Sequence, residues 1–152
     1  MGFLVATDCR GNVYLEDITM EIRKITADDY HLIREINTDD ERMKALIVGV
    51  SNQIKDYSSD VLRAYVAVTR GKTVGFVYGF VLPNRLLLPQ YMYLEPKFRG
   101  NYLGQALLEA LEKDSGCVQA IIYFESPLSE YYQRQGYEVG NAVVAMKALS
   151  RD

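Results

Sequence analysis

The sequence has few of the residues that build metal sites and disulfide frameworks. It contains two cysteines, Cys9 and Cys117, which follow no C-x-x-C spacing, and a single histidine, His31. These counts argue against a zinc site and against a framework of disulfides, and they favour reduced thiols in a cytoplasmic protein. We therefore expect no bound metal.

Long apolar runs and a strong excess of one charge are also lacking. No apolar run approaches the roughly 18 residues that are needed to cross a membrane. The apolar start Phe3–Ala6 is too short for a secretion signal. The net charge of -3 argues, though weakly, against nucleic acid or a membrane surface as a partner.

The material that is present suits one folded domain. A chain of 152 residues with 49% hydrophobic residues can bury a normal core. Residues 1–19 differ from the rest, because the apolar segments Phe3–Thr7 and Val13–Leu15 flank a turn-rich spacer. They form either an extra hairpin, on a sheet edge or a partner subunit, or an extension before a domain at residues 20–152. The pattern leaves both open.

The N-terminal half predicts a strand followed by two helices. Met20–Ile25 alternates like a strand, and Thr26, with acidic residues behind it, has the composition of a helix start. A second helix is expected after the acidic cluster Asp39–Glu41, because apolar residues recur at helical spacing as far as about Lys55. We interpret the acidic cluster as stabilising this helix rather than attracting a substrate.

The remainder alternates between strands and helices. The expected strands are Ala64–Val68, Val74–Val81, Leu86–Leu88 with Tyr91–Leu94, Val118–Phe124 and Asn141–Ala148. The expected helices are Leu103–Ser115 and Leu128–Gln135, the second ended by Gly136. This order predicts an α+β fold, with a mixed, mostly antiparallel sheet that is flanked by helices.

The junction between the Leu94 strand and the next helix has the composition of an anion site. Backbone N–H groups at a helix start, together with the helix dipole, favour a phosphate there. Gly100 and Gly104 allow close approach to the main chain, and Arg99 adds a positive charge. The spacing matches neither a P-loop nor a dinucleotide fingerprint. The residues therefore indicate a phosphate-binding turn, with an ordinary surface turn as the alternative.

Two motifs resemble the GNAT superfamily of N-acetyltransferases. One reads Leu94-Glu95-Pro96, then Arg99-Gly100-Asn101-Tyr102-Leu103-Gly104, similar to a strand ending Val-x-Pro and the family's Arg/Gln-x-x-Gly-x-Gly/Ala. The other, Tyr131–Tyr137, is similar to the family's aromatic-Tyr-x-x-x-Gly-aromatic helix. Tyr102 departs from the family pattern, since it stands where the first family glycine is expected, and its ring must point away from the pyrophosphate. The resemblance spans Met20 to Leu149.

The resemblance implies where acetyl-coenzyme A binds. The backbone of Met92, Tyr93 and Leu94 would bond the pantetheine arm and supply the N–H that stabilises the oxyanion. The pyrophosphate would lie on the turn and first helical residues: Arg99, Gly100, Asn101, Tyr102, Leu103, Gly104 and Gln105.

The resemblance also implies catalytic roles in a direct transfer from the thioester to an amine. Tyr132 matches the family's general acid, and a phenol is protonated at neutral pH. Glu125 and Glu95 are both candidates for the base, and we favour Glu125. The alternatives are that both are ordinary exposed carboxylates and that, as in some relatives, no side chain acts as the base.

The predicted function is acetyl transfer from acetyl-coenzyme A to a primary amine of a small molecule, peptide or protein. The acceptor itself is not predicted. Another reading is a module of the same fold that binds an acyl-coenzyme A without catalysis. A homodimer is compatible with the resemblance, because members are frequently dimers.

Overall fold

The computed structural model describes residues 6–7, 13–15, 18–100 and 102–149. They belong to two units, a larger one that extends to Ile122 and a smaller one, Tyr123–Asp152. Each unit is described by itself.

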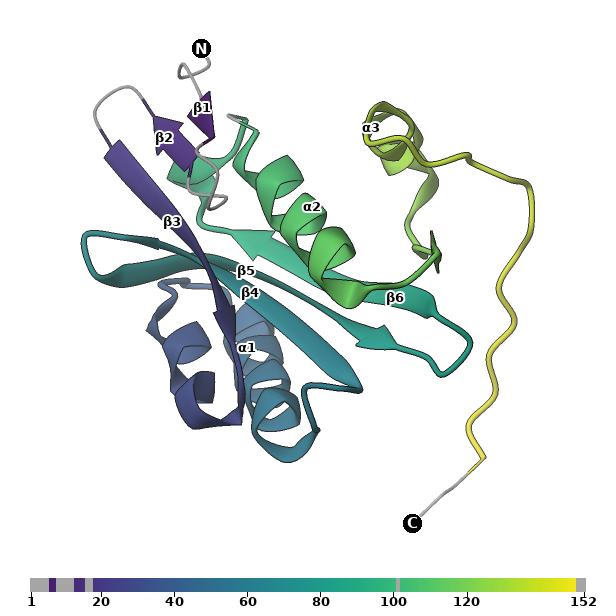
Figure 1. Ribbon diagram of the computed structural model, residues 1–152, viewed down its shortest axis with the longest axis horizontal. Coiled ribbons are helices and arrows are strands. Elements are labelled where there is room, and N and C mark those ends of the chain that lie inside the picture. The colour runs from purple at the N-terminus through teal and green to yellow at the C-terminus, as the bar shows by residue number, and fades with distance from the viewer. Residues whose placement is uncertain (1–5, 8–12, 16–17, 101, 150–152) are drawn as a thin grey trace. The chain divides into compact units, whose positions relative to one another are not determined.

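The larger unit is built on one sheet of seven strands, which neighbour one another in chain order (Figure 1). The strands are β1 (Ala6–Thr7), β2 (Val13–Leu15), β3 (Ile18–Ile25), β4 (Leu62–Thr69), β5 (Lys72–Val81), β6 (Leu86–Leu94) and β7 (Gln119–Ala120). Neighbours are antiparallel except for β6 and β7, which are parallel. The predicted mixed and mostly antiparallel sheet is confirmed.

Helices cover both faces of this sheet (Figure 1). α2 (Leu103–Ser115) packs on one face, where Leu103, Leu107 and Leu111 are fully buried. The 3₁₀-helix η1 (Ala27–Glu35) and α1 (Glu41–Asp56) pack on the other face, over a cluster that contains Phe76 and Tyr78. The short 3₁₀-helix η2 (Pro96–Phe98) precedes α2. The sheet therefore has two cores, one on each face.

The described N-terminal residues extend the sheet. Ala6 and Thr7 pair with Tyr14 and Val13, and β2 pairs in turn with β3. These pairings have the form of a hairpin on the sheet edge. The turn-rich spacer, residues 8–12, lies outside the described residues, as does Cys9.

The helix that was predicted after Thr26 is a 3₁₀-helix rather than an α-helix. The Thr26 N–H donates to Asp29 Oδ1 at 2.6 Å, and the backbone of Asp29 has non-helical angles (φ -125°, ψ 24°). The bond belongs to a capping box, which satisfies a free donor at the helix start, so the expected cap at Thr26 is present. The segment behind it is nevertheless kinked at Asp29 and forms a 3₁₀-helix, so the prediction of an α-helix here is wrong.

α1 begins where the acidic cluster predicted it. The Asp40 carboxylate accepts hydrogen bonds from the N–H groups of Arg42 and Met43, at 2.9 and 3.3 Å. These are two of the helix's otherwise unpaired donors, so Asp40 is its N-cap. The structural reading of this cluster is confirmed.

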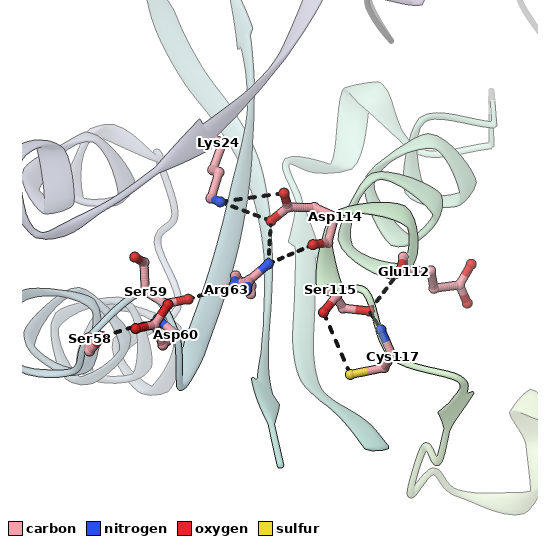
Figure 2. Close-up of polar contacts among 9 residues, drawn as sticks. All are labelled: Lys24, Ser58, Ser59, Asp60, Arg63, Glu112, Asp114, Ser115 and Cys117. Carbon is pink, nitrogen blue, oxygen red and sulfur yellow. Dashed lines mark hydrogen bonds and ion pairs between the residues drawn. The ribbon is translucent and has the colours of Figure 1, made fainter. Parts of the chain in front are cut away.

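Charged side chains attach the end of α2 to the sheet (Figure 2). Asp114 Oδ2 lies 3.1 Å from Lys24 Nζ of β3 and 3.1 Å from Arg63 Nη1 of β4. Burial disfavours the charged carboxylate, but the hydrogen bonds and charges of Lys24 and Arg63 outweigh it and hold the pKa of Asp114 below its usual value. The network positions the C-terminal end of the helix, and hence its axis, over the sheet.

The smaller unit contains less regular structure than the sequence predicted. It has a short 3₁₀-helix, η3 (Ser126–Leu128), and α3 (Ser129–Arg134), after which Gly136 has the expected positive φ of 89°. The strand predicted at Asn141–Ala148 is absent, since the described residues after Gly136 form no helix or strand. The run predicted at Val118–Phe124, most of which belongs to the larger unit, is a strand only at Gln119–Ala120. Apolar alternation permits a strand, but a strand exists only where a neighbour pairs with its backbone.

Candidate functional site

β6 pairs with β7 only at its start. Leu87 is opposite Ala120, and the N–H of Ile121 donates to Leu87 O at 2.9 Å. In a parallel ladder the next donor on β6 would be residue 89. That residue is Pro89, which has no N–H, so the ladder cannot continue. The missing donor explains why pairing between the two strands stops there.

A bulge follows the proline. Tyr78 of β5 is opposite Tyr91, whereas Gly79 is opposite Pro89, so Gln90 is an extra residue on β6. A bulge bends a strand and increases its twist. Beyond it, no strand in the described part of the chain pairs with Met92–Leu94 on the side away from β5. The backbone of these three residues therefore has one open edge.

The turn after β6 is held by its own residues. Arg99 Nε donates to Leu94 O at 2.9 Å, and the guanidinium carbon lies 5.3 Å from the centre of the Tyr93 ring. Arg99 itself is exposed, so its charge remains accessible. The structure thus brings together three of the predicted cofactor residues, Tyr93, Leu94 and Arg99, where β6 ends.

The turn leads directly into α2. Gly100 and Tyr102 both have positive φ, 80° and 66°. The first helical hydrogen bond runs from Ala106 N–H to Tyr102 O at 3.0 Å. The amides of Gly104 and Gln105 come before it and lack an intrahelical acceptor. Together with the helix dipole and Arg99, these donors could hold an anion.

Of the other predicted cofactor residues, Met92 is half-buried, Leu103 is buried in the core, and Asn101 lies outside the described residues. Leu103 can contribute its backbone only, because its side chain packs with α2's apolar face.

Tyr102 adopts a left-handed conformation that a tyrosine disfavours, and its side chain is 70% exposed. We expect Tyr102→Gly to raise the free energy of unfolding by about 0.5–1 kcal/mol, because glycine has no Cβ to strain at positive φ. Urea unfolding measures this change. Coenzyme A affinity should stay within about twofold, a difference under 0.5 kcal/mol.

Arg70, at the β4–β5 turn, is the matched control, since its φ is 53° and it is remote from the predicted cofactor residues in sequence. Arg70→Gly should give a similar gain in stability and no change in coenzyme A affinity. A loss of affinity in Tyr102→Gly alone would show that the exposed ring contacts the ligand.

The predicted catalytic residues lie in the smaller unit. Tyr132 of α3 is half-buried among aromatic rings, with ring centres 4.7 Å from Phe124, 5.1 Å from Tyr131 and 6.0 Å from Tyr137. This burial raises the pKa of the Tyr132 phenol above its ordinary value. Glu125, in contrast, is exposed, and its carbonyl accepts the N–H of Leu128 to start the short helical segment.

Two residues without a predicted role, Pro89 and Gln90, shape the site, because the proline ends the pairing with β7 and the bulge at Gln90 bends β6. A proline inside an apolar strand run is typical of a strand edge or a bulge, and it is the feature that could have indicated them.

Comparison with known families agrees with this geometry. A family model described as an acetyltransferase (GNAT) domain matches residues 60–139, more than half of the chain. This chain belongs to the GNAT acetyltransferase family. The match covers β4 to α3, and so includes β6, the turn, α2 and Tyr132. The resemblance that the two motifs indicated is therefore confirmed.

Solved GNAT structures have the same fold. An aminoglycoside N-acetyltransferase, AAC(6')-Iy in complex with coenzyme A, superposes with a TM-score of 0.70 at 14% identity, covering 89% of this chain and 98% of that one. A ribosomal-protein-alanine N-acetyltransferase from Brucella melitensis biovar Abortus 2308 gives a TM-score of 0.64 at 15% identity, covering 85% and 99%. Glucosamine-6-phosphate N-acetyltransferase from Arabidopsis thaliana gives 0.60 at 18%, covering 87% and 99%. No match was found among curated proteins.

The described residues contain no group of three or more His, Cys, Asp or Glu side chains arranged to hold a metal ion. Within the same ranges, no helix combines the length and the apolar composition that crossing a membrane requires.

Proposed function

We propose that this GNAT-family chain transfers an acetyl group from acetyl-coenzyme A to a primary amine of a small molecule, peptide or protein. The observation that carries the proposal is the open edge of Met92–Leu94, which leads through a turn held by Arg99 into the start of α2, where the amides of Gly104 and Gln105 have no intrahelical acceptor. The open edge of β6 suits a pantetheine arm, which carries amide groups, and the start of α2 suits a pyrophosphate.

The donor site uses mainly backbone. Open N–H groups at the end of β6 can bond amide carbonyls and, at one position, the oxygen of the reacting acetyl group. The amides of Gly104 and Gln105, with the Arg99 guanidinium, provide hydrogen bonds and positive charge for phosphates. Acetyl-coenzyme A, when bound, supplies the activated thioester.

We propose Tyr132 as the general acid. Its burial raises the pKa of the phenol, so the proton remains on the oxygen at neutral pH and can be donated to a departing thiolate. Exposed Glu125 stays the proposed proton acceptor for the amine, acting directly or through water.

The test is release of free thiol from acetyl-coenzyme A across a panel of amines, amino acids, aminoglycosides and peptides. Release that depends on one class of amine supports the proposal and identifies the acceptor class. Coenzyme A binding without release for any amine would instead support an acyl-coenzyme A-binding module of the same fold. A dimer or monomer is a separate question, which light scattering answers.

We expect Arg99→Ala to weaken coenzyme A affinity about tenfold or more, because a hydrogen bond to a charged group contributes about 1.5–3 kcal/mol. Isothermal titration calorimetry measures the affinity. Lys97→Ala is the matched control: it removes a positive charge from the same turn, but the Lys97 ammonium lies over the Phe98 ring, 5.1 Å from its centre. Equal losses in both variants would show that only net charge matters and would contradict a specific role for Arg99.

A further inference from the structure

Glu95 is a buried carboxylate at the point where β6 ends and the turn begins. Only 6% of the residue is exposed. Its backbone is fixed on both sides, since the Glu95 N–H donates to Val74 O of β5 and its carbonyl accepts from Phe98 N–H of η2, both at 2.9 Å. The residue is therefore a rigid part of the cofactor turn.

The side chain of Glu95 reaches a segment that is remote in sequence. Glu95 Oε2 accepts a hydrogen bond from the Asn37 N–H at 3.3 Å. Asn37 follows η1 and begins the connection to α1, which ends at the N-cap Asp40. We call residues 37–40 the η1–α1 connection. One side chain thus links the cofactor turn to this connection.

Burying a carboxylate costs free energy, because the charged form loses its hydration. A charged group that leaves water needs a cation or several hydrogen bonds to offset the loss of hydration. No ion pair to Glu95 exists among the residues that the structure describes. Its hydrogen bond comes from a backbone N–H and is charge-assisted. The carboxylate therefore holds the main chain of the connection, whichever side chain stands at residue 37.

The η1–α1 connection joins the two helices that pack on the face of the sheet opposite α2. α2 covers the other face, and its N-terminus belongs to the proposed cofactor site. On the η1 and α1 face, Tyr93 packs against the core cluster, while Tyr91 stacks on Phe76 at 6.3 Å between ring centres and is 41% exposed. Tyr91 is thus an exposed residue of β6 on this face, three residues before the strand ends at Leu94. An amine that approaches the strand opposite α2 would meet this face, and we treat it as the acceptor side.

We propose that Glu95 is a positioning residue that couples the cofactor turn to the η1–α1 connection, so that coenzyme A binding orders the acceptor side. The inference rests on the proposed function for the identity of the cofactor. Because the backbone of Glu95 is fixed next to the turn, its carboxylate holds the Asn37 amide at a defined place relative to that turn. A ligand that orders the turn would then also order residues 37–40. Burial and this bond distinguish Glu95 from a proton acceptor, which must reach the amine.

Hydrogen–deuterium exchange of the full chain, with and without coenzyme A, tests the coupling. In the wild type, coenzyme A should slow exchange in residues 98–106 and also in residues 36–40. Glu95→Ala should keep the protection of 98–106 and lose that of 36–40. Glu95→Gln, which retains an oxygen acceptor of the same size, should recover part of the protection of residues 36–40. This variant still tests the coupling if Glu95→Ala folds poorly.

Glu35→Gln is the matched control. Glu35 Oε1 also accepts from a backbone N–H, that of Thr73 at 3.4 Å, but Thr73 belongs to β5 and not to the turn. The ligand-dependent protection of residues 36–40 should persist in this variant.

Kinetics provide a second measurement. Glu95→Ala should raise KM for the amine about tenfold, the effect of losing one charge-assisted hydrogen bond, with coenzyme A affinity within about twofold. Glu95→Gln should restore most of the loss in KM.

The outcomes separate the two hypotheses. Protection of neither segment in the wild type would overturn the cofactor site and this inference with it. Protection of 98–106 alone in the wild type, or equal protection of 36–40 in Glu95→Ala, would overturn only the coupling. Loss confined to 36–40 in Glu95→Ala supports it.

Discussion

Replacing Tyr132 by phenylalanine should lower the turnover rate by about 100-fold or more, the range for loss of a general acid, and leave coenzyme A affinity nearly unchanged. The ring of Tyr132 packs among Phe124, Tyr131 and Tyr137, and phenylalanine preserves that packing. The only group removed is the hydroxyl. Because burial raises the pKa of this phenol, wild-type activity should fall through loss of this proton only above the ordinary tyrosine pKa. Steady-state thiol release over a range of pH, together with calorimetric titration of coenzyme A, measures these effects.

Tyr131→Phe is the control for this experiment. Tyr131 neighbours Tyr132 in the chain and in the aromatic cluster, and burial likewise raises the pKa of its phenol. Turnover in Tyr131→Phe should remain near the wild-type value. Unchanged turnover in Tyr132→Phe, or equal losses in both variants, would remove the assignment of Tyr132 as the acid.

Gly79→Ala should lower the free energy of unfolding by about 1–3 kcal/mol, the usual cost of inserting a methyl group into a closely packed position. A Cβ at residue 79 would lie 2.9 Å from Leu88 O and 2.9 Å from the Cα of Pro89. Both are backbone atoms of β6, so the strand itself must shift at the bulge. Because the shifted backbone continues to Met92–Leu94, coenzyme A affinity should fall as well. Urea unfolding and calorimetry measure the two effects.

Gly49→Ala is the opposite case in the same chain. Gly49 is in the interior of α1, and a Cβ there would meet no atom within 4 Å. Alanine in a helix interior is favoured over glycine by about 0.5–1 kcal/mol, so this variant should be more stable than the wild type. Stability of Gly79→Ala equal to the wild type would show that β5 and β6 separate without cost and would contradict the rigid bulge.

The residue pattern correctly predicted those elements whose formation depends on residues close together in the sequence. The start of α1 at Asp40, the hairpin of β4 and β5, and the length of α2 to Gly116 follow from caps, turns and apolar spacing, which act within a few residues. The phosphate-binding character of the turn at Gly100 was expected on the same basis, because helix N-termini and glycine backbone have these properties in any fold.

Two predictions of secondary structure were wrong, in segments that the local residue pattern does not decide by itself. Asn141–Ala148 has the composition of a strand but no regular structure, and the helix predicted after Thr26 is a 3₁₀-helix with a kink at Asp29. In Asn141–Ala148 the intrinsic preference for a strand is worth less than the absence of a strand that pairs with it.

The sequence by itself indicated the family, through two short motifs and their order, and it predicted an anion site at the start of α2. Only the tertiary structure decided which backbone edge is open and which side chains are held together. Pairing between β6 and β7 ends after Leu87 and Ala120, and the loss of an N–H at Pro89 matters only because the fold places β7 beside this part of β6. The link from Glu95 to Asn37 joins residues that are 58 positions apart. Such contacts depend on how the sheet and its helices pack, and no local pattern encodes a distance across the fold.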